Sequence, residues 1–163
     1  MKAALLVIDL QKAFVDDDNR RSMERACEYI NAAIPLFRKR GLPVVWIQHR
    51  DDGDGVVPGS PGFEFLDTLK PEPGDARLVK TYGNSFHGTG LAELLSKHGL
   101  DTVVATGYCA ENCVLSTVRG AQDIDLVPIV LKGSIASGVA ERVRFVEDIS
   151  PLMSFGALAK ALD

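Results

Sequence analysis

The amino-acid sequence predicts an α/β fold, with three α/β/α layers around a six-stranded, mainly parallel, doubly wound sheet. Two observations support this prediction. Short apolar runs of strand length alternate with longer segments whose apolar residues recur every three or four positions. The first run, residues 3–8, is apolar at every position, which is typical of a strand that is covered on both faces.

Length and composition set the general class of protein. The chain has 163 residues, 46% hydrophobic and 25% charged, which favours a single folded domain, residues 1–163, over a disordered chain. The net charge of −4 argues against nucleic acid or an anionic membrane as a partner. No apolar run reaches the roughly 20 residues of a membrane span, and the N-terminus does not resemble a signal peptide. Three cysteines are too few for a disulfide-stapled secreted domain, so we expect a cytoplasmic protein.

The first half of the chain predicts three strands separated by helical segments. The expected order is strand, helix, strand, short helix and strand, at residues 3–8, 20–40, 43–47, 63–69 and 77–80. Pro35 should kink or end the long helix, and Gly41 suits the residue after its end. Residues 51–62 are rich in Gly, Pro and Asp and should form a loop.

The second half continues the alternation from a helix to a closing helix. The expected helices and strands alternate at residues 91–98, 102–106, 113–121, 126–131, 139–146, 151–155 and 157–162. Pro128 indicates a local irregularity in its strand. Because parallel strands all end at one edge, a ligand should bind at the carboxyl ends of these strands.

Three chemically reactive residues fall on that edge. Asp9 follows the first strand, Lys80 ends the third, and Cys113 begins the helix after the fourth. Taken singly, they are a turn former, a solvated charge and a small buried residue. Together they suit a covalent cysteine hydrolase, because a helix N-terminus and a lysine should both lower the pKa of the thiol. The carboxylate would then carry protons.

Three sequence blocks carry a resemblance to a known family. They read VIDLQKAF at 7–14, VKTYGNSF at 79–86 and TGYCAENCV at 106–114. In order and spacing they resemble the isochorismatase-like cysteine hydrolases, and the resemblance extends from about Ala3 to the end of the chain. It implies the fold predicted above and a hydrolytic activity.

The resemblance also implies roles for the reactive residues. Asp9, Lys80 and Cys113 match the family's catalytic triad. The cysteine would form a thioester with the substrate, the aspartate would move the proton, and the lysine would balance charge. Backbone N–H groups of Cys109 and Cys113 would form the oxyanion hole, and the Tyr108–Cys109 peptide bond would be cis.

Other positions are expected to bind substrate. By resemblance Phe14 lines the pocket, with Gln11 beside it and Tyr108 in the third block. Trp46 and His49 end the second strand and should close the other side. Two departures from the family pattern, Ala110 and residues 133–137, border the site and bear on substrate identity.

No cofactor or metal is expected. In nicotinamidases a metal site follows the strand that matches the second one here, and it is built on an Asp-x-His pair with further histidines. This chain has three histidines in all, His49, His87 and His98, on separate segments. A zinc or iron site is therefore not predicted.

Several functions remain open from the sequence. The first is an amidohydrolase that acts on a small amide, ureido or carbamoyl compound, and the second is an isochorismatase-type vinyl ether hydrolase. A nucleotide-binding or redox module, with a Cys109–Cys113 pair, is a third possibility, although the Gly-x-Gly of Gly88 and Gly90 is not continued to a third glycine. A binding protein without catalysis is a fourth. By resemblance the protein should be a homo-oligomer, either a dimer or a tetramer, with a small-molecule substrate.

Overall fold

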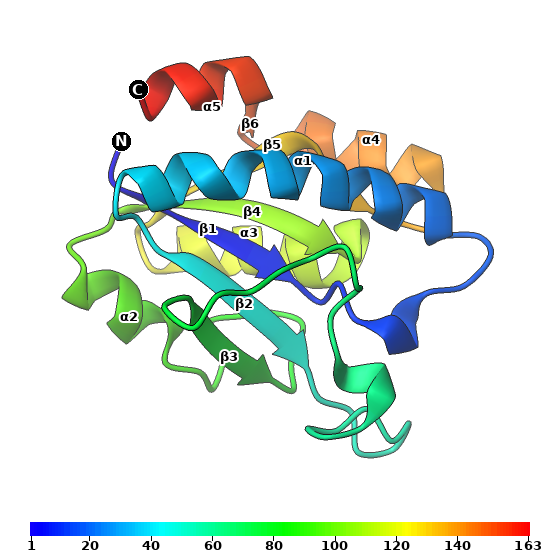
Figure 1. Ribbon diagram of the computed structural model, residues 1–163. Helices are drawn as coiled ribbons and strands as arrows, with labels where there is room; N and C mark the ends of the chain where they lie inside the picture. The colour runs from blue at the N-terminus through cyan, green and yellow to red at the C-terminus, as the bar shows by residue number, and fades with distance from the viewer.

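The computed structural model describes residues 1–163 and is built on one six-stranded sheet with the order β3-β2-β1-β4-β5-β6. Every neighbouring pair of strands is parallel. The strands are β1 (Ala3–Ile8), β2 (Val44–His49), β3 (Ala76–Lys80), β4 (Thr102–Tyr108), β5 (Val127–Ala136) and β6 (Leu152–Met153). The order runs outward from β1 in both directions, which confirms the doubly wound α/β fold (Figure 1).

Five α-helices and three short helical turns connect the strands. The α-helices are α1 (Arg20–Lys39), α2 (Leu91–Lys97), α3 (Leu115–Asp123), α4 (Ala140–Ile149) and α5 (Phe155–Ala161). The turns are the 3₁₀ turns η1 (Lys12–Phe14) and η2 (Pro61–Phe63) and the π-helical turn η3 (Ala110–Val114). The two chain ends lie near each other at one side of the molecule (Figure 1).

The core is divided by the sheet into two sides, because successive residues of a strand face opposite directions. On β1, Ala3, Leu5 and Val7 join the cluster formed with α1 and α5. Ala4, Leu6 and Ile8 join the cluster formed with α2 and the end of α3. Each of these six side chains is fully buried. The continuous apolar run therefore has the cause predicted for it, a helical layer on each face of the sheet.

Pro35 does not end the first helix, so that part of the prediction is wrong. α1 continues through Pro35 to Lys39. Its buried face includes Ile30 and Ile34 before the proline and Phe37 after it. Because burial of such side chains is worth about 2 kcal/mol each, it offsets the hydrogen bond that proline removes.

The predicted helix at residues 63–69 is also wrong. Only η2 is helical there, and the following segment runs in extended pairing beside the chain that follows β1. The N–H of Lys12 donates to the carbonyl of Glu64 at 2.9 Å, and the N–H of Leu66 donates to that of Leu10 at 3.0 Å. These long-range bonds replace the local bonds that a helix would need.

The irregularity in β5 lies further along the strand than Pro128 suggested. Pro128 pairs with Val103 in regular register, and the register shifts only between Val130 and Ile135. Gly133 lies in this bulge with a φ of +84°, and a side chain there would collide with the ring of Tyr29. The bulge carries β5 on to Ala136, beside the end of β4.

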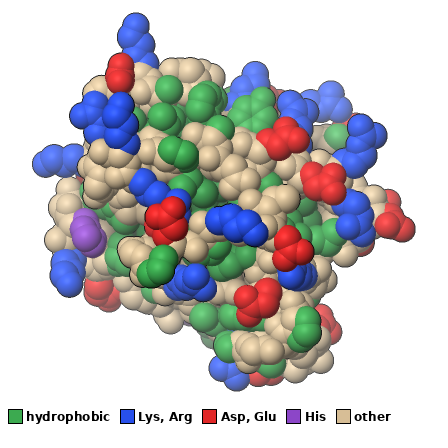
Figure 2. Space-filling model, in the orientation of Figure 1, with side chains coloured by type: hydrophobic (Ala, Val, Ile, Leu, Met, Phe, Trp, Pro, Cys, Tyr) green, Lys and Arg blue, Asp and Glu red, His purple; other side chains and the backbone are tan.

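No helix of the structure combines the length and apolar character that crossing a lipid bilayer requires. On the face shown in Figure 2, lysine and arginine side chains are interspersed with aspartate and glutamate.

Candidate active site

The three predicted reactive residues lie together at the carboxyl edge of the sheet. Asp9 directly follows β1, Lys80 is the last residue of β3, and Cys113 lies in η3 after β4. The Nζ atom of Lys80 lies 2.7 Å from Oδ2 of Asp9. A carboxylate oxygen of Asp9, the sulfur of Cys113 and a ring nitrogen of His49 all lie within 4.8 Å of one another. Residues from four separate segments thus share one small space.

The backbone at the ends of β1 and β4 brings Asp9 and the cysteine turn together. Asp9 adopts a φ of +52°, which is uncommon for a residue other than glycine, and its N–H donates to the carbonyl of Ile47 at 3.0 Å. Gly107 pairs with Ile8 and has a φ of +116°. A side chain at Gly107 would collide with the backbone of Ile8. The close approach of β4 to β1 therefore requires glycine.

Lys80 is buried, and its ammonium contacts three polar groups. Besides Asp9, Nζ contacts the carbonyl oxygen of Tyr82 at 3.0 Å and Nδ1 of His49 at 3.0 Å. The side chain of Lys80 is 0% exposed, and that of Asp9 is 2% exposed. A buried charge is tolerated only when it is paired and hydrogen-bonded, and Lys80 meets both conditions.

The sequence predicts a lowered pKa for Cys113, and the structure gives the opposite. Burial, with the negative charge of Asp9 added, raises the pKa of the Cys113 thiol to about 12. Lys80 acts in the lowering direction but does not outweigh these effects. In the substrate-free protein Cys113 is therefore a thiol at neutral pH.

Burial also raises the pKa of the Asp9 carboxyl group, and Lys80 and a hydrogen bond from Cys113 oppose that shift. A carboxylate with a raised pKa is a stronger base than an exposed one. The pair of a neutral thiol and a basic carboxylate suits proton transfer from sulfur to oxygen at the moment of attack.

The turn between β4 and η3 contains the expected cis peptide bond between Tyr108 and Cys109. The backbone N–H of Cys109 has no acceptor within the protein. Burial, with Glu111 beside it, raises the pKa of the Cys109 thiol to about 12. All three cysteines are free, and Cys27 is buried on α1 as the apolar stripe predicts.

Three of the predicted substrate-binding residues lie side by side and keep part of their surface exposed. The ring of Phe14 stacks on that of Tyr108 with centroids 6.3 Å apart, and it meets His49 edge-on at 6.2 Å. All three are only partly buried. They form an aromatic wall next to the Asp9–Lys80 pair.

The other two predicted substrate-binding residues, Trp46 and Gln11, are fully buried. Trp46 is fully buried in the core under α1, contacts Phe65 edge-on at 5.2 Å, and donates its indole N–H to Asp75 at 2.8 Å. Gln11 is also fully buried, and its amide bonds the backbone of His49 in both directions, at 3.0 and 2.6 Å. Neither Trp46 nor Gln11 has surface available to a substrate in this structure.

Two residues that support the site, Asn19 and Glu111, were not predicted from the sequence. Buried Asn19 donates to the Phe14 carbonyl at 2.8 Å and contacts the Tyr108 hydroxyl at 3.2 Å, which ties the aromatic wall to the start of α1. Glu111 accepts from Ser137 at 3.0 Å and from Arg142 at 2.8 Å. Only the place of Asn19 before a helix and of Glu111 in the cysteine block could have signalled them.

Metal-ligand types also meet at this edge, since Asp9, His49 and Cys113 offer a carboxylate, an imidazole and a thiol. The ammonium of Lys80 already bonds the first two, at 2.7 and 3.0 Å. His87 and His98 lie on other segments. In this arrangement the carboxylate of Asp9 and the imidazole of His49 are partners of the Lys80 ammonium.

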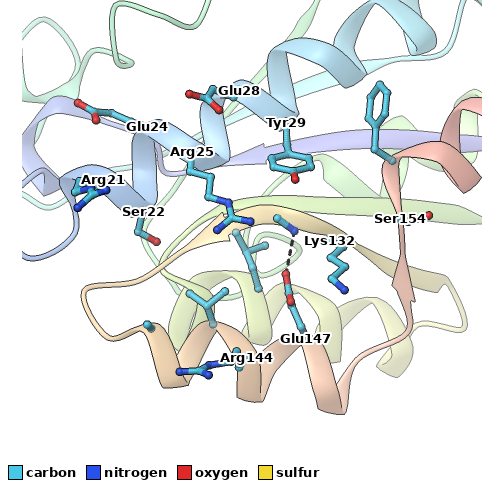
Figure 3. A pocket seen from close by; sticks show the side chains of 15 residues that line it. Arg21, Ser22, Glu24, Arg25, Glu28, Tyr29, Lys132, Arg144, Glu147 and Ser154 are labelled. Atoms are coloured by element: carbon cyan, nitrogen blue, oxygen red, sulfur yellow. Dashed lines mark hydrogen bonds between the residues drawn. The ribbon is translucent and has the colours of Figure 1, made fainter.

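A groove of about 910 Å³ lies elsewhere, between α1 and α4 beside β5 (Figure 3). Arg25 and Tyr29 reach into it from α1 (Figure 3). Because β6 pairs only with residues 130 and 131, the later part of β5 has no strand on this side. The side chain of Glu147 accepts from the N–H of Gly133 at 2.9 Å. No cysteine lines the groove, so the site described above lies outside it.

The sheet order and the buried Asp–Lys pair beside a cysteine define a doubly wound α/β protein with a reactive cluster at its carboxyl edge. A family model described as "Isochorismatase domain" matches residues 3–146, and the chain belongs to the isochorismatase family. It is 36% identical over 121 residues to the uncharacterized isochorismatase family protein YrdC of Bacillus subtilis (strain 168), covering 72% of this chain and 65% of the relative.

Two further comparisons concern proteins with named activities. The ureidoacrylate amidohydrolase RutB of Methylorubrum extorquens is 28% identical over 165 residues, covering 78% of this chain and 66% of the relative. The crystal structure of N-carbamoylsarcosine amidase from Thermoplasma acidophilum matches with a TM-score of 0.83 and 27% identity, covering 95% and 97% of the two chains. The chain thus spans slightly less than two thirds of YrdC and of RutB.

Proposed function

We propose that this protein is a cysteine hydrolase that cleaves the C–N bond of a small amide, ureido or carbamoyl compound through a thioester on Cys113. The observation that carries the proposal is the buried Asp9–Lys80 pair, 2.7 Å across, directly beside the Cys113 thiol. Two relatives named as an amidohydrolase and an amidase support the bond type. The chain spans slightly less than two thirds of YrdC and of RutB, so the proposal names a class of substrate and not one compound.

In the first half of the reaction the sulfur of Cys113 attacks the carbonyl carbon, and its proton passes to Asp9. The oxyanion of the tetrahedral intermediate accepts hydrogen bonds from the backbone N–H groups of Cys109 and Cys113, and the free N–H of Cys109 supports this role. Such donors are commonly worth about 3 kcal/mol each. The C–N bond then breaks, and Asp9 gives its proton to the leaving nitrogen.

In the second half water hydrolyses the thioester. The water oxygen attacks the acyl carbon while Asp9 takes a proton from the water. The C–S bond then breaks, and Asp9 returns that proton to the sulfur of Cys113, which leaves as a thiol. Lys80 stays charged throughout and stabilises each state in which Asp9 is negative. Its three bonds hold it in place, so no reorganisation is needed during the cycle.

Substrate recognition falls to the aromatic wall of Phe14, His49 and Tyr108. Their partial exposure beside the reactive cluster supports this part of the proposal. A flat, mostly unsaturated acyl group would stack on these rings.

The test is a panel of amides, ureido and carbamoyl compounds and nicotinamide, with ammonia release as the readout. We expect turnover of at least one compound by the wild type, none by Cys113→Ala, and nearly full turnover by the matched control Cys27→Ala. Intact-protein mass spectrometry should detect the acyl group on the wild type and on Cys27→Ala, but not on Cys113→Ala. Ammonia release by Cys113→Ala would contradict covalent catalysis by this cysteine.

The proposal includes a reducing, cytoplasmic setting, which a free catalytic thiol needs, and a homo-oligomer. Apolar side chains on the outside of α4 support self-association, since Phe145 is 56% exposed, Val139 before it is 38% exposed and Ile149 is 37% exposed. Light scattering should give a dimer or tetramer mass. A monomer mass at micromolar concentration would contradict that part.

A further inference from the structure

His49 is linked to the reactive cluster by the sheet itself. It pairs with Lys80 across β2 and β3, so the two side chains leave the sheet on the same side. The ring of His49 lies with Nδ1 3.0 Å from Nζ of Lys80. Because Lys80 in turn bonds Asp9, the ammonium connects the imidazole to the carboxylate.

The chemistry of this contact fixes the state of the ring. An ammonium has three donors and no acceptor, so the nitrogen of His49 that faces Lys80 must accept. Nδ1 therefore carries no proton, and a neutral ring must carry its proton on Nε2. Of the three possible states of the ring, two neutral tautomers and the imidazolium, the contact specifies the neutral tautomer with its proton on Nε2.

The backbone of His49 is held from the other side. Gln11 accepts from its N–H at 2.6 Å and donates to its carbonyl at 3.0 Å. Gln11 is fully buried, and the ring of Phe14 packs edge-on against that of His49 with centroids 6.2 Å apart. The backbone that carries the imidazole is thus held by a buried amide, three residues before that aromatic ring.

We propose that His49 is a positioning residue, which as a neutral imidazole accepts from Lys80 and so holds the ammonium in its ion pair with Asp9. This role rests on the proposed function, because Asp9 and Lys80 serve the Cys113 thiol in that reaction. His49 acts through Lys80 and does not exchange a proton with the substrate.

The charged groups around the ring agree with a neutral state. Lys80 faces it from β3, Asp9 from the end of β1, Asp51 from the following loop and Cys113 from η3. Burial and the charge of Lys80 lower the pKa of His49, and the two aspartates oppose this. A protonated ring would lose its acceptor and bring a second cation to 3.0 Å from the ammonium.

The experiment compares two variants. His49→Asn offers an amide oxygen close to the place of Nδ1, whereas His49→Leu removes the acceptor and keeps bulk. The readouts are kcat and KM on a substrate from the panel, and the pH dependence of Cys113 alkylation by iodoacetamide, followed by mass spectrometry. The second readout needs no turnover, so it stands even if the proposed function fails.

We expect His49→Leu to lower kcat about tenfold or more with a smaller change in KM. Its alkylation profile should move to higher pH, lowering the rate at a fixed pH about threefold or more, because Asp9 is less well neutralised. His49→Asn should lie within about twofold of the wild type in alkylation. An unchanged alkylation profile in His49→Leu, or equal losses in both variants, would overturn the proposal.

A measurement on the wild type covers the case in which His49→Leu does not fold. Nitrogen-15 NMR of the imidazole rings at pH 7 should show His49 neutral with its proton on Nε2, assigned through the missing signals of His49→Asn. A ring protonated on Nδ1, alone or together with Nε2, would overturn the proposal. Loss of turnover in Cys113→Ala would tell separately whether the hydrolase function holds.

Discussion

The ammonium of Lys80 and the carboxylate of Asp9 form an ion pair of 2.7 Å in which neither side chain is more than 2% exposed. A buried pair of this kind adds little net stability compared with apolar residues of the same size, because both charges must leave water. Removing one member, however, leaves the other charge unpaired. The pair is therefore better explained by the chemistry proposed at Cys113 than by the needs of folding.

The first prediction follows from this asymmetry. Lys80→Met should lower the free energy of unfolding by about 3–5 kcal/mol, because Asp9 is left buried without its cation. The double variant Asp9→Asn with Lys80→Met should recover part of that loss. Urea denaturation of the wild type, both single variants and the double variant gives the coupling between the two residues. Additive effects would mean that the contact carries no coupling.

The second prediction concerns stability at alkaline pH. Folding raises the pKa of Cys113 from 9.0 to about 12, so the folded state holds its proton where the unfolded state releases it. The resulting stability is complete below pH 9 and is lost as the pH rises toward 12, at up to about 1.4 kcal/mol per pH unit. The unfolding free energy of the wild type should therefore fall with pH in this range.

The matched control for that measurement is Cys113→Ala. The variant loses a fixed amount of packing energy at every pH, but it lacks the titration of this thiol. Cys109 and Cys27 also have raised pKa values and contribute equally to both proteins. The stability difference between wild type and variant should therefore narrow between about pH 9 and pH 11. Parallel curves would show that Cys113 is not perturbed as described.

The third prediction addresses the backbone that brings β4 against β1. Gly107→Ala should lower the unfolding free energy by about 3 kcal/mol or more, because the residue is strained at a φ of +116° and its Cβ collides with Ile8. Gly156→Ala on α5 is the control, since a side chain there meets nothing within 4 Å. Thermal unfolding should show the control equal to the wild type or up to about 1 kcal/mol more stable.

How much of this site the sequence predicts depends on the kind of information each residue carries. Asp9 follows a predicted strand directly, Lys80 ends another, and Cys113 begins the helical turn after a third, so strand order and parallel topology place them on one edge. The contact of His49 with Lys80 depends on the register between β2 and β3, which neither segment encodes alone. The extended course of residues 64–66 likewise depends on pairing with a distant segment, Leu10 to Lys12.

The raised pKa of Cys113 could not be predicted for a related reason. The sequence shows which charges are near, and a lysine alone argues for a lower pKa. Burial and the opposing charge of Asp9 decide the direction, and both come from packing around η3. Residue identity gives the signs of neighbouring charges, whereas the balance between them requires the folded structure.

The last prediction separates a core role from a substrate role for Trp46. A strand covered on both faces shows no polar alternation, so the sequence could not tell which side of β2 the indole takes. Trp46→Phe keeps an aromatic ring against Phe65 but removes the donor to Asp75. The unfolding free energy should fall by about 1.5–3 kcal/mol, since that bond joins a carboxylate. The value of KM should stay within about twofold, whereas Phe14→Leu on the exposed wall should raise KM with little loss of stability. A raised KM in Trp46→Phe with unchanged stability would place the indole at the substrate and contradict its assignment to the core.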